Sequence, residues 1–445
     1  MFSRAIMAAF LLFAQAAAAQ AALAVDPGPE GGAWGDAEAQ AGRDDDDWED
    51  WDEAAAPAWT GYLELAGGSR WDRDPAVGRR TTLAEARWRL ERTWEGGRGR
   101  FDLRADLLAD AVLDEVRGEL REAAYSFKAG NSDVRLGRQP LTWGTGDLLF
   151  LNDLFPKGWV SFFIGRDDEY LKSPGDAIRL THFGEALNLD LVALPRVNPD
   201  EFLTGERLSF FSPAAGGAVA PDPPLGADEP SASVSNTEWA LRLFRNQGGN
   251  ELAVYGFRGY YHQPSPAGPG GSLVYPELDA LGASWRRTLG PGLFNAEFSR
   301  HYAHADRSGT DPRLPNDQLR FLLGYEWEAV ANLTLGFQYY LERTLDHAAL
   351  IDNSPWPQFE VAENRHWLTH RLSWRTRQDR VIWSLFLFYS PTDDDGYARP
   401  QVNWRISDQW LVSLGGNYFW GDDGPTFFAQ FEDNSNVYAR VRFSY

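Results

Sequence analysis

The sequence predicts an all-β fold, a transmembrane antiparallel β-barrel of about 18 strands with long extracellular loops and short periplasmic turns. Three observations predict it. From Trp59 onward, apolar and polar residues alternate over windows of about ten residues, as in strands with one apolar face. The connections alternate between tight turns and longer loops, and the chain ends on an alternating segment whose last residue is Tyr445.

Residues 1–24 have the features of a secretory signal peptide, with Arg4, an apolar core from Ala5 to Phe13 and small-residue A-x-A patterns near Ala21 and Ala24. The alternative, an N-terminal membrane anchor, is disfavoured because this core is too short to span a bilayer. The chain has no cysteine, which excludes a disulfide scaffold and thiolate metal sites. We therefore expect export to the bacterial outer membrane.

Residues 25–58 are rich in Gly, Ala, Pro and acid. The stretch from Asp36 to Glu53 holds ten acidic residues and one arginine, a net charge of −9 out of −22 for the whole chain. Such a segment buries too little apolar surface to offset its ordering entropy, so we expect a disordered periplasmic tail. The Asp44–Asp47 run lacks the spacing of a calcium loop, and we expect no metal site there.

The barrel itself is predicted over residues 59–445. The window around Arg80–Trp94 places Ala84, Ala86 and Trp88 on one face and Glu85 and Arg87 on the other. The windows start near residues 59, 80, 99, 116, 132, 175, 186, 236, 250, 277, 292, 317, 332, 364, 380, 396, 408 and 434. The strand number has a range of about 16 to 18, because the short windows near 132 and 396 could merge with their neighbours.

The lengths of the connections distinguish this barrel from a soluble β-sandwich. One set consists of tight turns such as 96–98 and 129–131, and the other includes the long segments 141–174, 196–235, 263–276 and 346–363. A membrane barrel separates its connections in this way, with turns on one side and loops on the other. Trp59, Trp71, Trp94, Trp374, Trp410 and Trp420 lie at strand ends and suit aromatic girdles at the two interfaces.

The last strand is similar to the C-terminal signal of bacterial outer-membrane barrels. Val437, Ala439, Val441, Phe443 and Tyr445 share one face, and the chain ends on the aromatic residue. The resemblance implies that the barrel assembly machinery recognises the strand ending at Tyr445.

The inward faces of the strands are predicted to line a pore, since a barrel of this size is too wide for side chains to fill. The predicted pore-lining residues are Glu85, Arg87, Arg89, Glu91, Asp102, Arg104, Asp106, Arg320, Arg365, Arg371, Arg375, Arg405, Arg440 and Arg442. Two interpretations stay open: the arginines attract anionic solutes, or they pair with the acids as a structural lattice.

The segment 141–174 is the third long connection, the position at which general porins fold a constriction loop into the lumen. The predicted constriction-loop residues are Trp143, Asp147, Asn152, Asp153, Arg166, Asp167, Asp168 and Glu169. Acids on this loop would face the arginine sector across the pore and set up a transverse field. The alternative is a loop that plugs and stiffens the barrel.

The stretch Val134–Gln139, followed by Trp143 and Gly144, resembles a segment of the alginate-export porin family, in which a strand ends in an R-x-G-R-Q-like motif. The resemblance covers about ten residues and implies an 18-stranded outer-membrane barrel with an arginine-rich pore for an anionic polysaccharide. The long acidic tail and the segment from Asn152 to Tyr170 have no place in that pattern.

These features predict a porin for passive diffusion of hydrophilic, anionic solutes, including oligosaccharides or polyuronates. An outer-membrane lipid or glycan hydrolase is the first alternative, but no G-x-S-x-G motif occurs and the seven histidines are scattered. An adhesion barrel that uses the Pro-rich loop 213–230 is the second. We expect no enzyme activity and no cofactor, with outer-membrane lipid and lipopolysaccharide as partners. No basic tract exists to bind nucleic acid.

Overall fold

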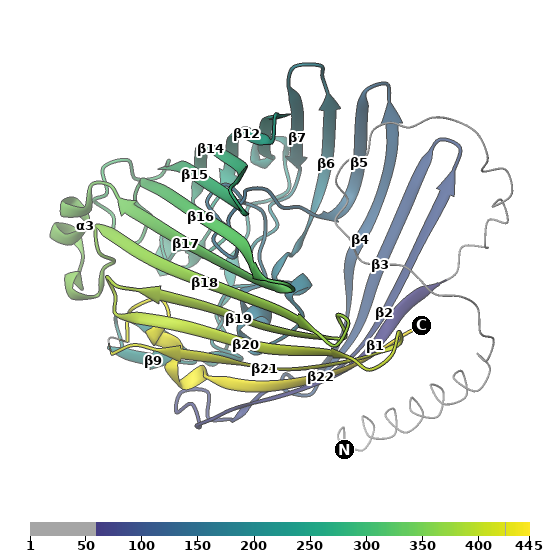
Figure 1. The fold of residues 1–445 in the computed structure, drawn as a ribbon. Coiled ribbons are helices and arrows are strands. Elements are labelled where there is room, and N and C mark those ends of the chain that lie inside the picture. The colour runs from purple at the N-terminus through teal and green to yellow at the C-terminus, as the bar shows by residue number, and fades with distance from the viewer. Residues whose placement is uncertain (1–58, 423) are drawn as a thin grey trace, which may run out of the picture. The chain divides into compact units, whose positions relative to one another are not determined.

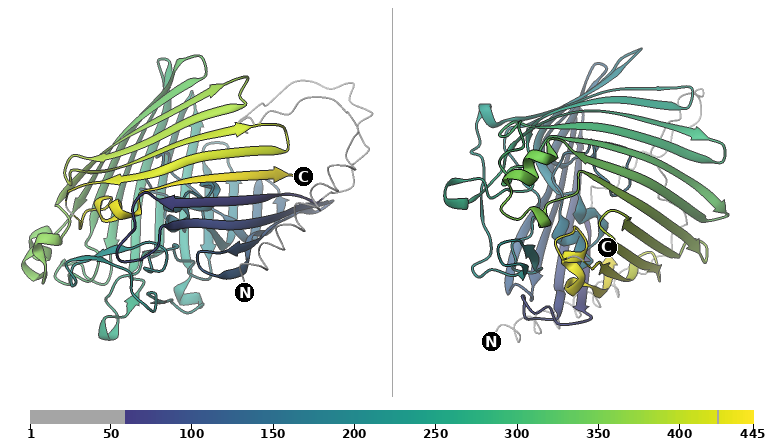
Figure 2. Two further views of the ribbon diagram at one scale, coloured as in Figure 1. Left: turned by 90° about the horizontal axis from the view of Figure 1, so that it is seen from below. Right: turned by 90° about the vertical axis from the view of Figure 1, so that its left-hand side faces the viewer.

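Eighteen strands form one antiparallel sheet that closes on itself, because the first strand, β1 (Thr60–Arg70), pairs with the last, β22 (Asn436–Ser444). The computed structural model describes residues 59–422 and 424–445. The predicted signal peptide 1–24 and acidic tail 25–58 lie outside the described residues. The closed ring of strands is visible in Figures 1 and 2. The predicted all-β barrel of about 18 strands is confirmed, and the windows near 132 and 396 are separate strands.

Each wall strand begins within two residues of a predicted window. Between β1 and β22 these strands are β2 (Thr81–Gly96), β3 (Gly99–Asp110), β4 (Glu115–Ala129), β5 (Ser132–Pro140), β6 (Pro174–Phe183), β7 (Asn188–Leu194), β11 (Glu238–Gln247), β12 (Asn250–Tyr260), β14 (Glu277–Leu289), β15 (Gly292–Ala303), β16 (Gln318–Val330), β17 (Leu333–Thr344), β18 (Asn364–Thr376), β19 (Val381–Ser390), β20 (Asp395–Arg405) and β21 (Trp410–Trp420).

The connections differ between the two ends of the barrel. At one end, here called the turn end, successive strands are joined by two to four residues, as at 97–98 and 248–249. At the other, the loop end, connections reach the length of 195–237. The connections contain the helices α2 (Trp159–Ile164) and α3 (His347–Asn353), the 3₁₀ turns η1 (Asp168–Leu171), η2 (Val234–Asn236), η3 (Pro269–Gly271), η4 (Pro357–Phe359) and η5 (Ala429–Asn434), and the short strands β8 (Phe210–Ser212), β9 (Gly217–Val219), β10 (Ala227–Asp228) and β13 (Leu273–Val274).

Alternation along each strand separates the two sides of the wall. In β2, Arg87 and Arg89 are 4% and 1% exposed, whereas Trp88 between them is 39% exposed. Exposed apolar side chains such as Leu107, Val254 and Leu281 form the outer surface. Of the predicted girdle residues, Trp59, Trp71, Trp374 and Trp410 are exposed at strand ends. Among the described residues, no helix is both long and apolar enough to cross a membrane.

Candidate functional site

The connection between β5 and β6, residues 141–173, lies against the inner side of the wall, and we call it the inner loop. Figure 1 shows its teal segments inside the ring of strands. Its partners come from β1, β2, β15, β17, β20 and β22, which are spread around the ring. The inner loop therefore narrows the lumen on several sides at once.

The first part of the inner loop is fixed by a carboxylate of β15. Glu297 accepts hydrogen bonds from the backbone amides of Thr145 and Gly146 and from Asn152 Nδ2, the last at 2.8 Å. Next to it, the Asp147 amide donates to Gln338 Oε1 of β17, and the Asp147 carboxylate accepts from Arg371 Nη1 of β18 at 2.9 Å. Buried Glu297 thus binds the backbone amides of the stretch 144–146. A contact with backbone amides leaves no pattern in the sequence.

The middle of the inner loop, α2, is apolar and packs on an aromatic cluster. Phe163 makes edge contacts with Tyr397 of β20 and Phe419 of β21 at ring distances of 5.9 and 5.4 Å, and it also contacts Phe431 of η5. The helix ends at Gly165, whose φ of 89° is left-handed. Tyr438 of β22 occupies the space that a Cβ at this position would fill, so glycine is required there.

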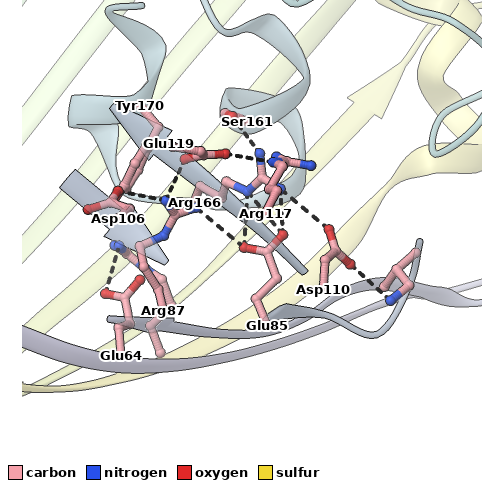
Figure 3. Close-up of polar contacts among 12 residues, drawn as sticks. Glu64, Glu85, Arg87, Asp106, Asp110, Arg117, Glu119, Ser161, Arg166 and Tyr170 are labelled. Atoms are coloured by element: carbon pink, nitrogen blue, oxygen red, sulfur yellow. Dashed lines mark hydrogen bonds and ion pairs between the residues drawn. The ribbon is translucent and has the colours of Figure 1, made fainter. Parts of the chain in front are cut away.

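Arg166 follows this glycine and joins the inner loop to β2 (Figure 3). Its Nη2 and Nε lie 2.5 and 3.0 Å from Glu85 Oε1, and its Nη1 donates to Ser161 Oγ. Burial by itself lowers the pKa of the guanidinium, but the Glu85 and Glu201 carboxylates outweigh burial and hold the pKa above its ordinary value. Arg166 is therefore a permanent cation in this buried ion pair.

Three successive acids of the inner loop bind three groups of wall arginines. Asp167 Oδ2 lies 2.9 Å from both Arg440 Nη1 and Arg442 Nη2 of β22. Burial alone raises the pKa of Asp167, but these two arginines reverse the effect and hold the pKa well below its usual range. The next two acids complete the series: Asp168 lies 2.5 Å from Arg399 Nη2, and both carboxylate oxygens of Glu169 lie 2.7 Å from Arg89 Nη1.

Tyr170 completes this arrangement. Its hydroxyl donates to Asp106 Oδ2 at 2.8 Å, accepts from Arg89 Nη2 at 2.6 Å and lies 2.7 Å from the Tyr62 hydroxyl. The Arg87 guanidinium stacks 4.0 Å from the Tyr170 ring centroid. Arg87, Arg89 and Asp106, predicted to line the pore, thus meet Tyr62 and Tyr170, which were not predicted as site residues.

The remaining predicted residues fall into two groups. The first group has partners within the barrel. The ion pairs are Glu91 with Arg104, Asp102 with Arg100 and Arg135, Asp153 with Lys157, and Glu342 with both Arg320 and Arg365. Trp143 Nε1 donates a hydrogen bond to the Asp190 carboxylate. In the second, Arg375 and Arg405 share the inward face of their strands near the turn end, and their side chains have no hydrogen-bond or ion-pair partner among the described residues. Arg286 of β14 is in the same state.

Several contributors were missed by sequence reasoning. Glu119 and Glu297 lie on inward faces that strand alternation could have identified. Arg207, in the 195–237 connection, pairs with buried Asp110. Because a loop has no residue periodicity, the sequence could not predict this contact.

Two cavities lie along the inner side of the wall. At the turn end of β2 to β7, a cavity of about 1100 Å³ is lined by five basic residues, Arg98, Arg100, Lys128, Arg135 and Arg179, and two acids, Glu95 and Asp133. Towards the loop end, a cavity of about 370 Å³ has aromatic walls that include Trp159, Tyr340 and Trp367. Within residues 59–422 and 424–445, no group of three or more His, Asp or Glu could hold a metal ion.

The barrel fold is shared with a solved bacterial structure. OccAB4 of Acinetobacter baumannii superposes with a TM-score of 0.54 and 10% identity, covering 87% of this chain and 97% of that one. OccK11 (OpdR) of Pseudomonas aeruginosa gives 0.48 and 12%, covering 87% and 95%, and a mutant porin of Rh. blastica gives 0.41 and 12%, covering 88% and 100%. No family model and no curated protein matches the chain, so the alginate-export resemblance stays a prediction.

Proposed function

We propose that this protein is an outer-membrane channel for passive diffusion of hydrophilic, anionic solutes, with the inner loop forming the narrowest section. The observation that carries the proposal is a closed 18-stranded ring whose inner side is charged and is contacted from several sides by the inner loop. Such a ring is too wide for wall side chains to fill, and a solute path beside the inner loop is the expected result.

The anion preference rests on arginines that have no carboxylate partner among the residues that the structure describes. Arg87, Arg89, Arg440 and Arg442 are all neutralised by acids of the wall or the inner loop. Arg286, Arg375 and Arg405 are exposed on the inward face near the turn end. Free guanidinium groups bind carboxylate or phosphate in bidentate fashion, so these three arginines would attract anions.

The location follows from the same arrangement. An outer surface of exposed apolar residues suits lipid contact, and we place the turn end in the periplasm because short turns lie there in bacterial barrels. In this orientation the strand ending at Tyr445 is presented on the periplasmic side, where the assembly machinery would recognise it.

The test is single-channel recording of the refolded full chain in planar bilayers, with reversal potentials measured in a salt gradient. We expect measurable conductance and a preference for chloride, gluconate and glucuronate over potassium. In the triple variant R286A/R375A/R405A, the reversal potential should move towards cation preference.

The matched control is R313A, because Arg313 is exposed outside the lumen wall in the 304–317 loop. This variant should keep the parental reversal potential. The absence of any single-channel current would overturn the channel. An unchanged reversal potential in the triple variant would overturn the assignment of anion preference to these arginines.

A further inference from the structure

A groove of about 490 Å³ indents the outer side of the wall near the loop end of β11, β12 and β14. Gly256 is the cause of the indentation. In the strand register it lies between Leu241 of β11 and Leu281 of β14, which are 36% and 58% exposed on the same outward face. Since glycine has no side chain, the apolar row has a gap in its middle that is bounded by two leucines.

The next row towards the loop end is polar and aromatic. Trp239, Arg258, Asp279 and Tyr302 are consecutive partners across four strands. His304 Nε2 lies 2.6 Å from Asp279 Oδ2 and so occupies that carboxylate. The Arg258 side chain is exposed and has no hydrogen-bond or ion-pair partner in the described part of the chain.

Two further guanidinium groups lie beside this row. Arg300 and Arg307 stack on the Tyr302 ring, 4.7 and 5.2 Å from its centroid, and Arg307 also lines the groove. Both are 3.6 to 3.8 Å from the single carboxylate of Asp317. Arg300 and Arg307 therefore share the Asp317 carboxylate, Asp279 is already paired with a histidine, and the Arg258 guanidinium has no carboxylate partner among the described residues.

An unpaired arginine on the lipid-facing side of a barrel costs free energy that depends on depth, and an anion beside it removes this cost. We propose that the groove binds a phosphorylated, acylated lipid of the lipid A type, with one acyl chain over Gly256 and a phosphate on Arg258 and Arg307. The inference rests on the proposed outer-membrane location, because the loop end then lies in the outer leaflet. It does not require that the barrel conduct.

The experiment is native mass spectrometry of the refolded full chain in detergent, titrated separately with bisphosphorylated lipid A, phosphatidylglycerol, diacylglycerol and inorganic phosphate. We expect lipid A to bind more tightly than the other three. The variant R258A/R307A should weaken lipid A binding about tenfold, the size expected for losing charged hydrogen bonds to the phosphate.

A second variant, G256L, and a control variant separate the acyl contribution to binding from the phosphate contribution. G256L puts a side chain into the gap, and its Cβ is accommodated because an added Cβ meets only Leu281 Cδ2, at 3.9 Å. It should weaken both lipid A and diacylglycerol. The control R245A removes another outward arginine, at the turn end of β11, for which residues 59–422 and 424–445 supply no partner. It should leave lipid A binding unchanged.

Equal lipid A binding by the parent and R258A/R307A would overturn the phosphate site. Unchanged binding of lipid A and diacylglycerol by G256L would overturn the acyl groove. Phosphatidylglycerol binding as tightly as lipid A would overturn the choice of lipid. A channel that conducts but shows these results would refute only the groove, whereas a lipid-binding protein without current would refute only the channel.

Discussion

Arg166 of the inner loop and Glu85 of β2 form a buried ion pair in which both Nε and Nη2 of the guanidinium contact Glu85 Oε1. Arg207, from a different connection, reaches the same carboxylate at 3.7 Å. One wall residue therefore connects two loops to the inside of the barrel.

Replacing Arg166 with alanine should leave Glu85 buried without its main partner. Breaking one half of a buried pair typically costs about 3 to 5 kcal/mol, whereas removing both charges together can be nearly neutral. We therefore expect R166A to lower the free energy of unfolding more than the double variant R166M/E85M does. Urea unfolding in lipid vesicles, followed by tryptophan fluorescence, measures the difference. An equal loss of unfolding free energy in the two variants would show that the unpaired Glu85 carboxylate carries no extra cost.

Changing Gly165 to alanine should displace α2. The left-handed φ costs alanine roughly 1 kcal/mol, and overlap of the new Cβ with the Tyr438 ring adds a packing cost of about 1 to 3 kcal/mol. The control is G216A: Gly216 also has a left-handed φ, of 64°, but no atom lies within 4 Å of its added Cβ. Single-channel traces of G165A should show larger and noisier current than the parent, and those of G216A should not.

Acidification should weaken docking of the inner loop through Asp167. Because its pKa is lower in the folded state than in the unfolded chain, the stabilisation is present above about pH 4 and is lost as the pH falls towards the lowered value. Conductance should thus be constant at neutral pH and change only in strong acid. D167N should remove this dependence, and an acid transition of the same size in D167N would assign it to another group.

His262 should give a pH dependence of the opposite sign. Its ring lies 3.2 Å from Glu238 and 4.0 Å from Asp200, and although burial and Lys157 lower its pKa, the two carboxylates raise it overall. The stabilisation is full below about pH 6.5 and is lost as the pH rises through the raised folded pKa. The urea midpoint should fall on the alkaline side in the parent and stay flat in H262Q. A parallel fall in H262Q would contradict the assignment.

The wall was predictable because strand alternation is a local property: Arg87 and Arg89 face inward for the same reason that Trp88 faces outward. The strands β8, β9, β10 and β13 were not predicted, because segments of two or three residues carry no period. The wall residues that the inner loop contacts could not be predicted from the sequence either. Tyr170 and Asp106 are 64 positions apart, and Asp167 and Arg440 are 273 apart, so only the folded ring brings them together.

The ring closes where β1 meets β22, joining residues as distant as Glu64 and Arg442, 378 positions apart. The inner loop contacts both sides of this seam. Asp167 accepts a hydrogen bond from Arg440 of β22, and Glu169 accepts one from Tyr62 of β1. Closing a long chain into a ring is opposed by entropy, and a third segment that bonds to both edges offsets part of that cost. The loop that narrows the lumen thus also joins the two edges of the ring, so that docking it and completing the barrel are coupled steps of assembly.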